Sequence, residues 1–130
     1  MRIRHLNDCP EIIAGDFTRL RELLHPDRNY PFCGRYSFAH AIVDVGQAST
    51  RHRLKSGEVY YILAGQGTMH VDGDSAPVGP GDVVEIPPGS VQWIENVGPD
   101  DLAFLCIVDP AWRAEDEEIL EDPLSRPRKP

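Results

Sequence analysis

The amino-acid sequence predicts an all-β fold built from short strands and tight turns. The chain of 130 residues contains 11 Gly and 12 Pro, and these residues interrupt the chain too often for a helix bundle. Hydrophobic residues make up 41% of the chain and charged residues 26%, a composition typical of a folded domain. A chain of this length buries about two-thirds of its unfolded surface. We therefore expect a single domain spanning residues 1–130.

Candidate strands recur about every 8–12 residues, which is the spacing of an antiparallel sandwich or barrel. Each candidate is rich in β-branched, aromatic or apolar residues, and most are bounded by Gly, Pro or Asp. The clearest candidates are 59–63, 83–86 and 102–108, and the others are 36–45, 68–71 and 90–94.

Two further segments have helical character. Residues 16–25 fit either an amphipathic helix or an alternating strand, ended in both cases by Pro26. Asp109 and Pro110 form a suitable N-cap and first turn, and they predict a short helix over 111–121 that packs outside the sheets. Residues 122–130 contain three prolines and predict a flexible tail.

The charge balance narrows the possible partners. The chain has a net charge of −8 and carries no basic stripe, which argues against nucleic acid and anionic membranes as partners. Its three cysteines are odd in number and have no C-x-x-C spacing, and no stretch has the apolar length of a signal or a membrane span. These features favour the cytoplasm.

Two spaced motifs lie between residues 46 and 96. The first is Gly46, His52, Glu58 and Gly65, and the second is Gly81, Pro87, Gly89, Gln92 and Asn96. Together they resemble the two motifs of the cupin superfamily, G-x5-H-x-H-x3-E-x6-G and G-x5-P-x-G-x2-H-x3-N. Eight of the ten motif positions agree. The resemblance implies a cupin jelly-roll β-barrel with its core at about residues 30–110. It also implies a homodimer, and an unpaired N-terminal strand edge would provide a surface for a second chain.

The two departures from the motifs concern metal ligands. Leu54 and Gln92 stand where the family has its second and third histidines. In cupins those histidines, another histidine and a carboxylate hold one metal ion, so the resemblance implies His52, Glu58 and Gln92 as the ligands here. Such a set suits Mn²⁺, Fe²⁺ or Zn²⁺, with water in the open positions. The alternative is a buried hydrogen-bonded cluster without metal, although a buried carboxylate without a partner is costly.

Other residues are candidates for the same site. His40 and His70 lie on strands before and after the first motif, and either could supply a missing ligand if it faced inward. Tyr60 should share the interior with Glu58 and is a candidate substrate contact, and Leu54 would form an apolar wall of the pocket.

The sequence supports two functions. In the first, the protein is an enzyme that uses one divalent metal on a small oxygen-rich substrate, by isomerase, lyase or dioxygenase chemistry, with Glu58 as candidate catalytic base. In the second, it is a non-catalytic sensor or small-molecule-binding module with a degenerate metal site.

Overall fold

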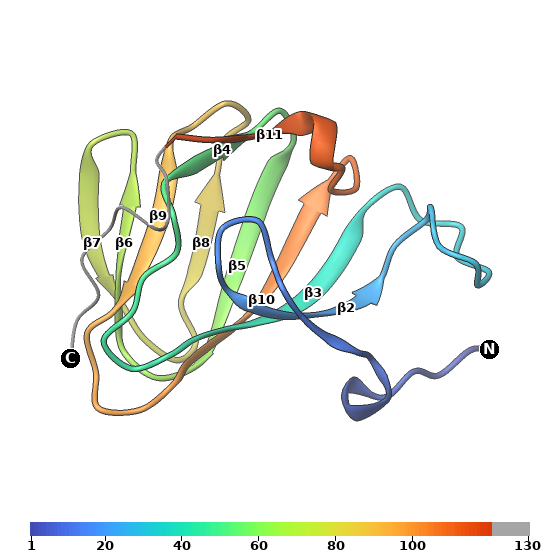
Figure 1. The fold of residues 1–130 in the computed structure, drawn as a ribbon, viewed down its shortest axis with the longest axis horizontal. Coiled ribbons are helices and arrows are strands. Elements are labelled where there is room, and N and C mark those ends of the chain that lie inside the picture. The colour runs from blue at the N-terminus through green and yellow to red at the C-terminus, as the bar shows by residue number, and fades with distance from the viewer. Residues whose placement is uncertain (121–130) are drawn as a thin grey trace.

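The computed structural model describes residues 1–120 and contains two antiparallel β-sheets that face one another (Figure 1). The six-stranded sheet consists, in spatial order, of β1 (Glu11–Ile13), β2 (Arg19–Leu24), β3 (Ser37–Val43), β10 (Leu102–Asp109), β5 (Gly57–Ala64) and β8 (Val83–Ile86). The five-stranded sheet consists of β11 (Glu117–Ile119), β4 (His52–Leu54), β9 (Gln92–Asn96), β6 (Gly67–Val71) and β7 (Asp74–Val78). This arrangement confirms the predicted antiparallel jelly roll, although within the described residues hydrogen bonds do not join the two sheets into a closed barrel.

The hydrophobic core lies between the sheets because alternate residues of each strand point inward. In β3 and β10 buried positions alternate with more exposed ones along the whole strand. The core takes side chains from both sheets, among them Ile62, Phe104, Met69 and Ile94. This alternation also turns one side of each strand toward the interior in which a site can form.

Glycines make the turns that join the strands. Gly46, Gly65, Gly81 and Gly89, all at motif positions, have positive φ. At Gly65 a side chain is excluded sterically as well, because a Cβ atom would lie 2.5 Å from the Asp101 carbonyl oxygen. The glycine-rich composition therefore reflects turns that the two sheets require.

The structure tests the two segments for which the sequence offered a helix. Residues 16–25 contain strand β2 and no helix. The helix predicted over 111–121 is wrong for the part that is described: a 3-10 turn (η2, Ala114–Asp116) leads into β11 instead. The backbone here pairs with other segments, since β11 pairs with β4 and the Trp112 amide donates to Ser37 Oγ. Residues 122–130 lie outside the described residues.

The remaining elements lie near the ends of the chain. A second 3-10 turn, η1 (Leu6–Asp8), precedes β1. Strands β1, β2 and β11 extend the sheets beyond the predicted core of residues 30–110. Among residues 1–120, no helix is long and apolar enough to cross a membrane.

Candidate functional site

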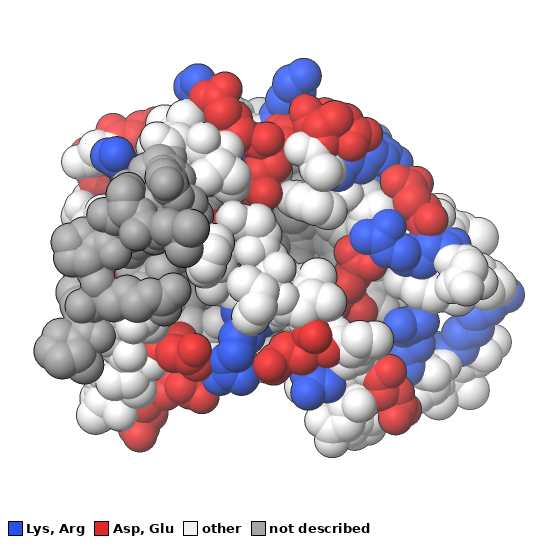
Figure 2. Space-filling model, in the orientation of Figure 1, with Lys and Arg blue, Asp and Glu red and all other residues white. Residues whose placement is uncertain are grey.

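A cavity of about 600 Å³ is lined by residues of both sheets and of the segment before β2. Figure 2 shows this side of the molecule with a hollow near its centre and acidic side chains along its border. Apolar side chains such as Leu54, Phe104 and Val108 form part of the wall. The ionisable groups His52, Glu58, Asp16 and Glu117 also line the cavity. The space is large enough for a small organic molecule.

His52 enters the cavity from β4 and is 2% exposed. Its Nδ1 atom lies 2.6 Å from the Thr50 carbonyl oxygen. A carbonyl oxygen can only accept, so Nδ1 carries the proton and donates it. In the neutral imidazole, Nε2 then keeps its lone pair, as in a histidine prepared to bind a metal ion. Nε2 lies 3.7 Å from Asp16 Oδ2, which is beyond hydrogen-bond distance.

Glu58 lies on β5 with its carboxylate buried. Oε2 accepts a hydrogen bond from the Cys106 thiol at 2.7 Å, whereas Oε1 is buried without a hydrogen-bond partner among the residues that the structure describes. Burial raises the pKa of Glu58, and the thiol hydrogen bond, the neighbouring His52 and the Gln92 side chain beside the carboxylate oppose this effect only in part. Burial and the Glu58 charge in turn raise the pKa of Cys106, which keeps its thiol protonated.

Gln92 and Tyr60 form a hydrogen-bonded pair beside these groups. Gln92 on β9 is the register partner of His52 on β4, and its side-chain oxygen accepts from the Tyr60 hydroxyl at 3.2 Å. Tyr60 packs against Phe104 with ring centroids 4.4 Å apart, and burial raises its pKa, so the hydroxyl remains a donor. Tyr60 lines the cavity and Gln92 does not.

Asp16 and Glu117 are residues of the cavity that the sequence reasoning missed. Asp16 lies in the loop between β1 and β2, and Glu117 is the first residue of β11, which pairs with β4. Glu117 Oε2 accepts from the Trp112 indole N–H at 3.3 Å. Burial and the neighbouring Asp16 raise the pKa of Glu117. The one signal for Asp16 was its Gly-Asp turn between two strands, since such loops often carry functional groups.

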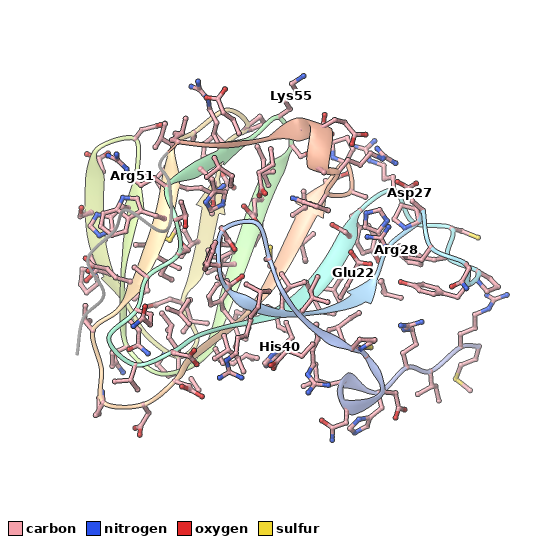
Figure 3. All side chains as sticks on the ribbon, in the orientation of Figure 1. Glu22, Asp27, Arg28, His40, Arg51 and Lys55 are labelled. Atoms are coloured by element: carbon pink, nitrogen blue, oxygen red, sulfur yellow. The ribbon has the colours of Figure 1, made fainter. Side chains whose placement is uncertain are left out.

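The structure places the two alternative histidines away from the cavity. His40 lies on the outer side of β3 (Figure 3), where partial burial lowers its pKa. His70 stacks on the Trp93 ring with centroids 3.8 Å apart, and its ring nitrogens bond to Glu95 and Ser75. Neither side chain lines the cavity, so neither replaces a missing ligand in this arrangement.

The side chains of the cavity meet some of the requirements of a metal site and lack others. Within residues 1–120, no three His, Cys, Asp or Glu side chains converge closely enough to hold an ion. Two features nevertheless match a ligand shell: the unpartnered Glu58 Oε1 and the His52 ring fixed through Nδ1. A complete shell therefore requires an amide or water oxygen, or movement of a nearby carboxylate.

Comparisons with known proteins give the family and the fold. Residues 39–108, more than half of the chain, match the family model described as "Cupin domain". An uncharacterised protein from Methanocaldococcus jannaschii is 43% identical over 110 residues, which are 84% of this chain and 86% of that protein. An oxalate-binding protein from Thermotoga maritima is also 43% identical, over 51 residues that cover 39% of this chain and 42% of that protein.

Solved structures resemble the whole fold. A predicted oxalate decarboxylase from Thermotoga maritima aligns with a TM-score of 0.71 and 25% identity, over 82% of this chain and 97% of that chain. A polyketide cyclase from Streptomyces resistomycificus aligns with a TM-score of 0.76 over 94% of this chain and 87% of that chain. Its identity of 20% makes this second similarity one of fold alone.

Proposed function

Because the chain belongs to the cupin family, we propose that its cavity binds one divalent metal ion and acts on a small oxygen-rich substrate, such as a sugar derivative or an enolisable acid. His52, Glu58 and the Gln92 amide oxygen are the proposed ligands. The observation that carries the proposal is Glu58 Oε1, a buried carboxylate oxygen without a partner among residues 1–120. A buried carboxylate of this kind is costly unless a cation or a proton meets it.

Each side chain around the cavity has a role in this proposal. A bound divalent ion would polarise a carbonyl or carboxylate oxygen of the substrate. Tyr60, held by Gln92, would position the substrate, while Leu54 and Phe104 exclude water from the apolar wall. Glu58 would accept a proton at Oε1 where the ion is held loosely. Isomerisation, elimination and dioxygenation are all compatible with this arrangement.

The relatives support the substrate class. The match to an oxalate-binding protein spans 51 residues, and a predicted oxalate decarboxylase shares the fold at 25% identity. A small acid would be repelled by the carboxylates of the cavity unless a cation lay between them. The acidic lining is therefore consistent with a substrate acid that binds in the cavity by coordinating a metal ion.

Elemental analysis tests the proposal. Protein purified without chelator, or incubated with Mn²⁺, Fe²⁺ or Zn²⁺, should hold close to one metal ion per chain. His52→Ala should lose it, because the variant lacks the imidazole that faces the cavity. His70→Ala is the matched control and should keep the metal, since its ring stacks on Trp93 away from the cavity. Wild-type protein that takes up none of the three ions would refute the proposal.

A second function is a non-catalytic small-molecule-binding module. The observation in its favour is that the Gln92 oxygen already accepts from Tyr60 and that Gln92 does not line the cavity. In this case, metal-free protein should gain thermal stability from a small organic ligand, and added metal should not increase the effect. A ligand-induced rise in Tm that requires metal would favour the enzyme instead.

A further inference from the structure

We propose that Asp16 is the carboxylate ligand that takes the place of the missing imidazoles, so that the ion lies between His52 and Asp16 rather than against Gln92. This inference rests on the proposed function in one respect, namely that the cavity binds a divalent ion, and it gives Asp16 the place that the proposed ligand set gives to Gln92. Asp16 precedes both sequence motifs by 30 residues or more and lies in the β1–β2 loop. It would give the ion a second carboxylate, a donor that hard cations such as Mn²⁺ favour.

The loop holds Asp16 toward His52 through several hydrogen bonds. Asp16 Oδ1 accepts from the Thr18 amide at 3.2 Å and from the Thr18 hydroxyl at 2.9 Å. The Asp16 carbonyl oxygen accepts from the Thr50 amide at 2.8 Å. The Thr50 carbonyl oxygen also accepts a hydrogen bond from His52 Nδ1–H, so Thr50 contacts both the backbone of Asp16 and the His52 ring. These bonds leave Asp16 Oδ2 as the oxygen that faces His52 Nε2.

The separation of these two atoms suits a shared ion better than a hydrogen bond. His52 Nε2 and Asp16 Oδ2 are 3.7 Å apart, too far for a hydrogen bond. Two donors that each lie about 2.0–2.2 Å from one ion are separated by about 3.0–3.5 Å at the usual coordination angles. A shift of a few tenths of an ångström in Asp16 would therefore bring both atoms to one ion.

The cavity also carries an excess of negative charge. Of its acidic groups, Glu22 is paired with Arg28 (Figure 3), whereas Asp16, Glu58 and Glu117 share the cavity with Arg4, whose guanidinium lies over the Tyr30 ring. The Glu117 carboxylate lies close to Gly15, the residue before Asp16, because a Cβ at Gly15 would lie 2.5 Å from Glu117 Oε1.

The buried Glu58 carboxylate also points to a ligand in this cavity. Glu58 is 7% exposed and its buried Oε1 atom is unpartnered within residues 1–120, while the side chain lines the same cavity as Asp16. A cation would stabilise a buried carboxylate oxygen that has no hydrogen-bond partner and shares its cavity with two further carboxylates.

The test is a titration of metal-free protein with Mn²⁺, in which electron paramagnetic resonance measures the free ion. Asp16→Asn keeps the size of the side chain and the oxygen that Thr18 binds, and it should weaken Mn²⁺ binding by about tenfold or more. Gln92→Leu should change the affinity by less than about threefold, and Asp74→Asn, an exposed control, should leave it unchanged. Wild-type binding with an unchanged Asp16→Asn affinity would overturn the inference and leave the proposed function standing. No binding by wild-type protein would overturn both.

A metal-preference variant keeps the test decisive if Asp16→Asn fails to fold. Asp16→Cys should lose Mn²⁺ affinity and gain Cd²⁺ affinity, with thiolate-to-metal charge-transfer absorption, because a thiolate ligand prefers the softer ion. A role of Asp16 in loop structure alone would not produce this absorption. Cd²⁺ bound without the charge-transfer band would count against Asp16 as a ligand.

Discussion

Glu58 shows how one residue can link stability to function. Its carboxylate is buried, and only one of its two oxygens has a partner among residues 1–120. Because burial raises its pKa above the value in the unfolded chain, the folded protein binds the Glu58 proton more tightly than the unfolded protein does. The contribution of Glu58 to metal-free stability therefore falls as pH rises from the unfolded pKa through the folded one.

Glu58→Gln should accordingly stabilise the metal-free protein at neutral pH. The amide retains an acceptor for the Cys106 thiol and removes the buried charge, so the free energy of unfolding should rise by about 1–2 kcal/mol at pH 7.5. The gain should shrink toward pH 4, where the wild-type carboxyl is protonated. Urea unfolding at the two pH values measures both effects. A variant less stable than wild type at pH 7.5 without metal would contradict the proposed cost of the charge.

At the scale of elements, the strands and motif turns were predictable because their signals are local. The two-residue period placed His52, Leu54, Glu58 and Tyr60 on buried positions of β4 and β5, as the structure shows. The pairing of β11 with β4 depends on contacts between residues more than 60 apart, so no local signal indicated it. For the same reason Glu117 and Asp16 were missed: their segments reach the cavity through long-range pairing and loop hydrogen bonds.

The turn glycines provide a test at this scale. Gly65 and Gly73 both have positive φ, +87° and +88°, but a Cβ would meet the Asp101 carbonyl only at Gly65 and has open space at Gly73. Gly73→Ala should therefore lower the free energy of unfolding by about 1 kcal/mol, and Gly65→Ala by about 3 kcal/mol. Urea unfolding of the two variants measures the difference. Equal losses would show that the close contact at Gly65 relaxes without cost.

At the scale of the whole molecule, the outer face of the six-stranded sheet carries an apolar patch in a chain with a net charge of −8. Tyr61, Leu63, Val83 and Ile107 are 43%, 41%, 65% and 39% exposed, on the adjacent strands β5, β8 and β10. Tyr61 is the register partner of both Val83 and Leu105, so these side chains form one continuous surface. Copies that repel one another through their net charge can still associate through such a face.

We therefore predict a homodimer in which two such sheet faces pack together. Light scattering coupled to gel filtration should give twice the mass of the chain. Tyr61→Lys should give a monomer that keeps its fold, because the side chain points away from the core. Lys55, which is exposed beyond β4, provides a control, and Lys55→Ala should leave the mass unchanged. A monomeric wild-type protein at concentrations of tens of micromolar would contradict the prediction.

We propose above all that this cavity holds a divalent cation through His52 and Glu58. A crystal structure of the protein grown with Mn²⁺ tests it most directly, because anomalous scattering locates the ion. We predict one ion about 2.0–2.3 Å from His52 Nε2 and from a Glu58 oxygen, with Asp16 turned toward it. A cavity without an ion at saturating Mn²⁺, or an ion bound only by surface carboxylates, would contradict the claim.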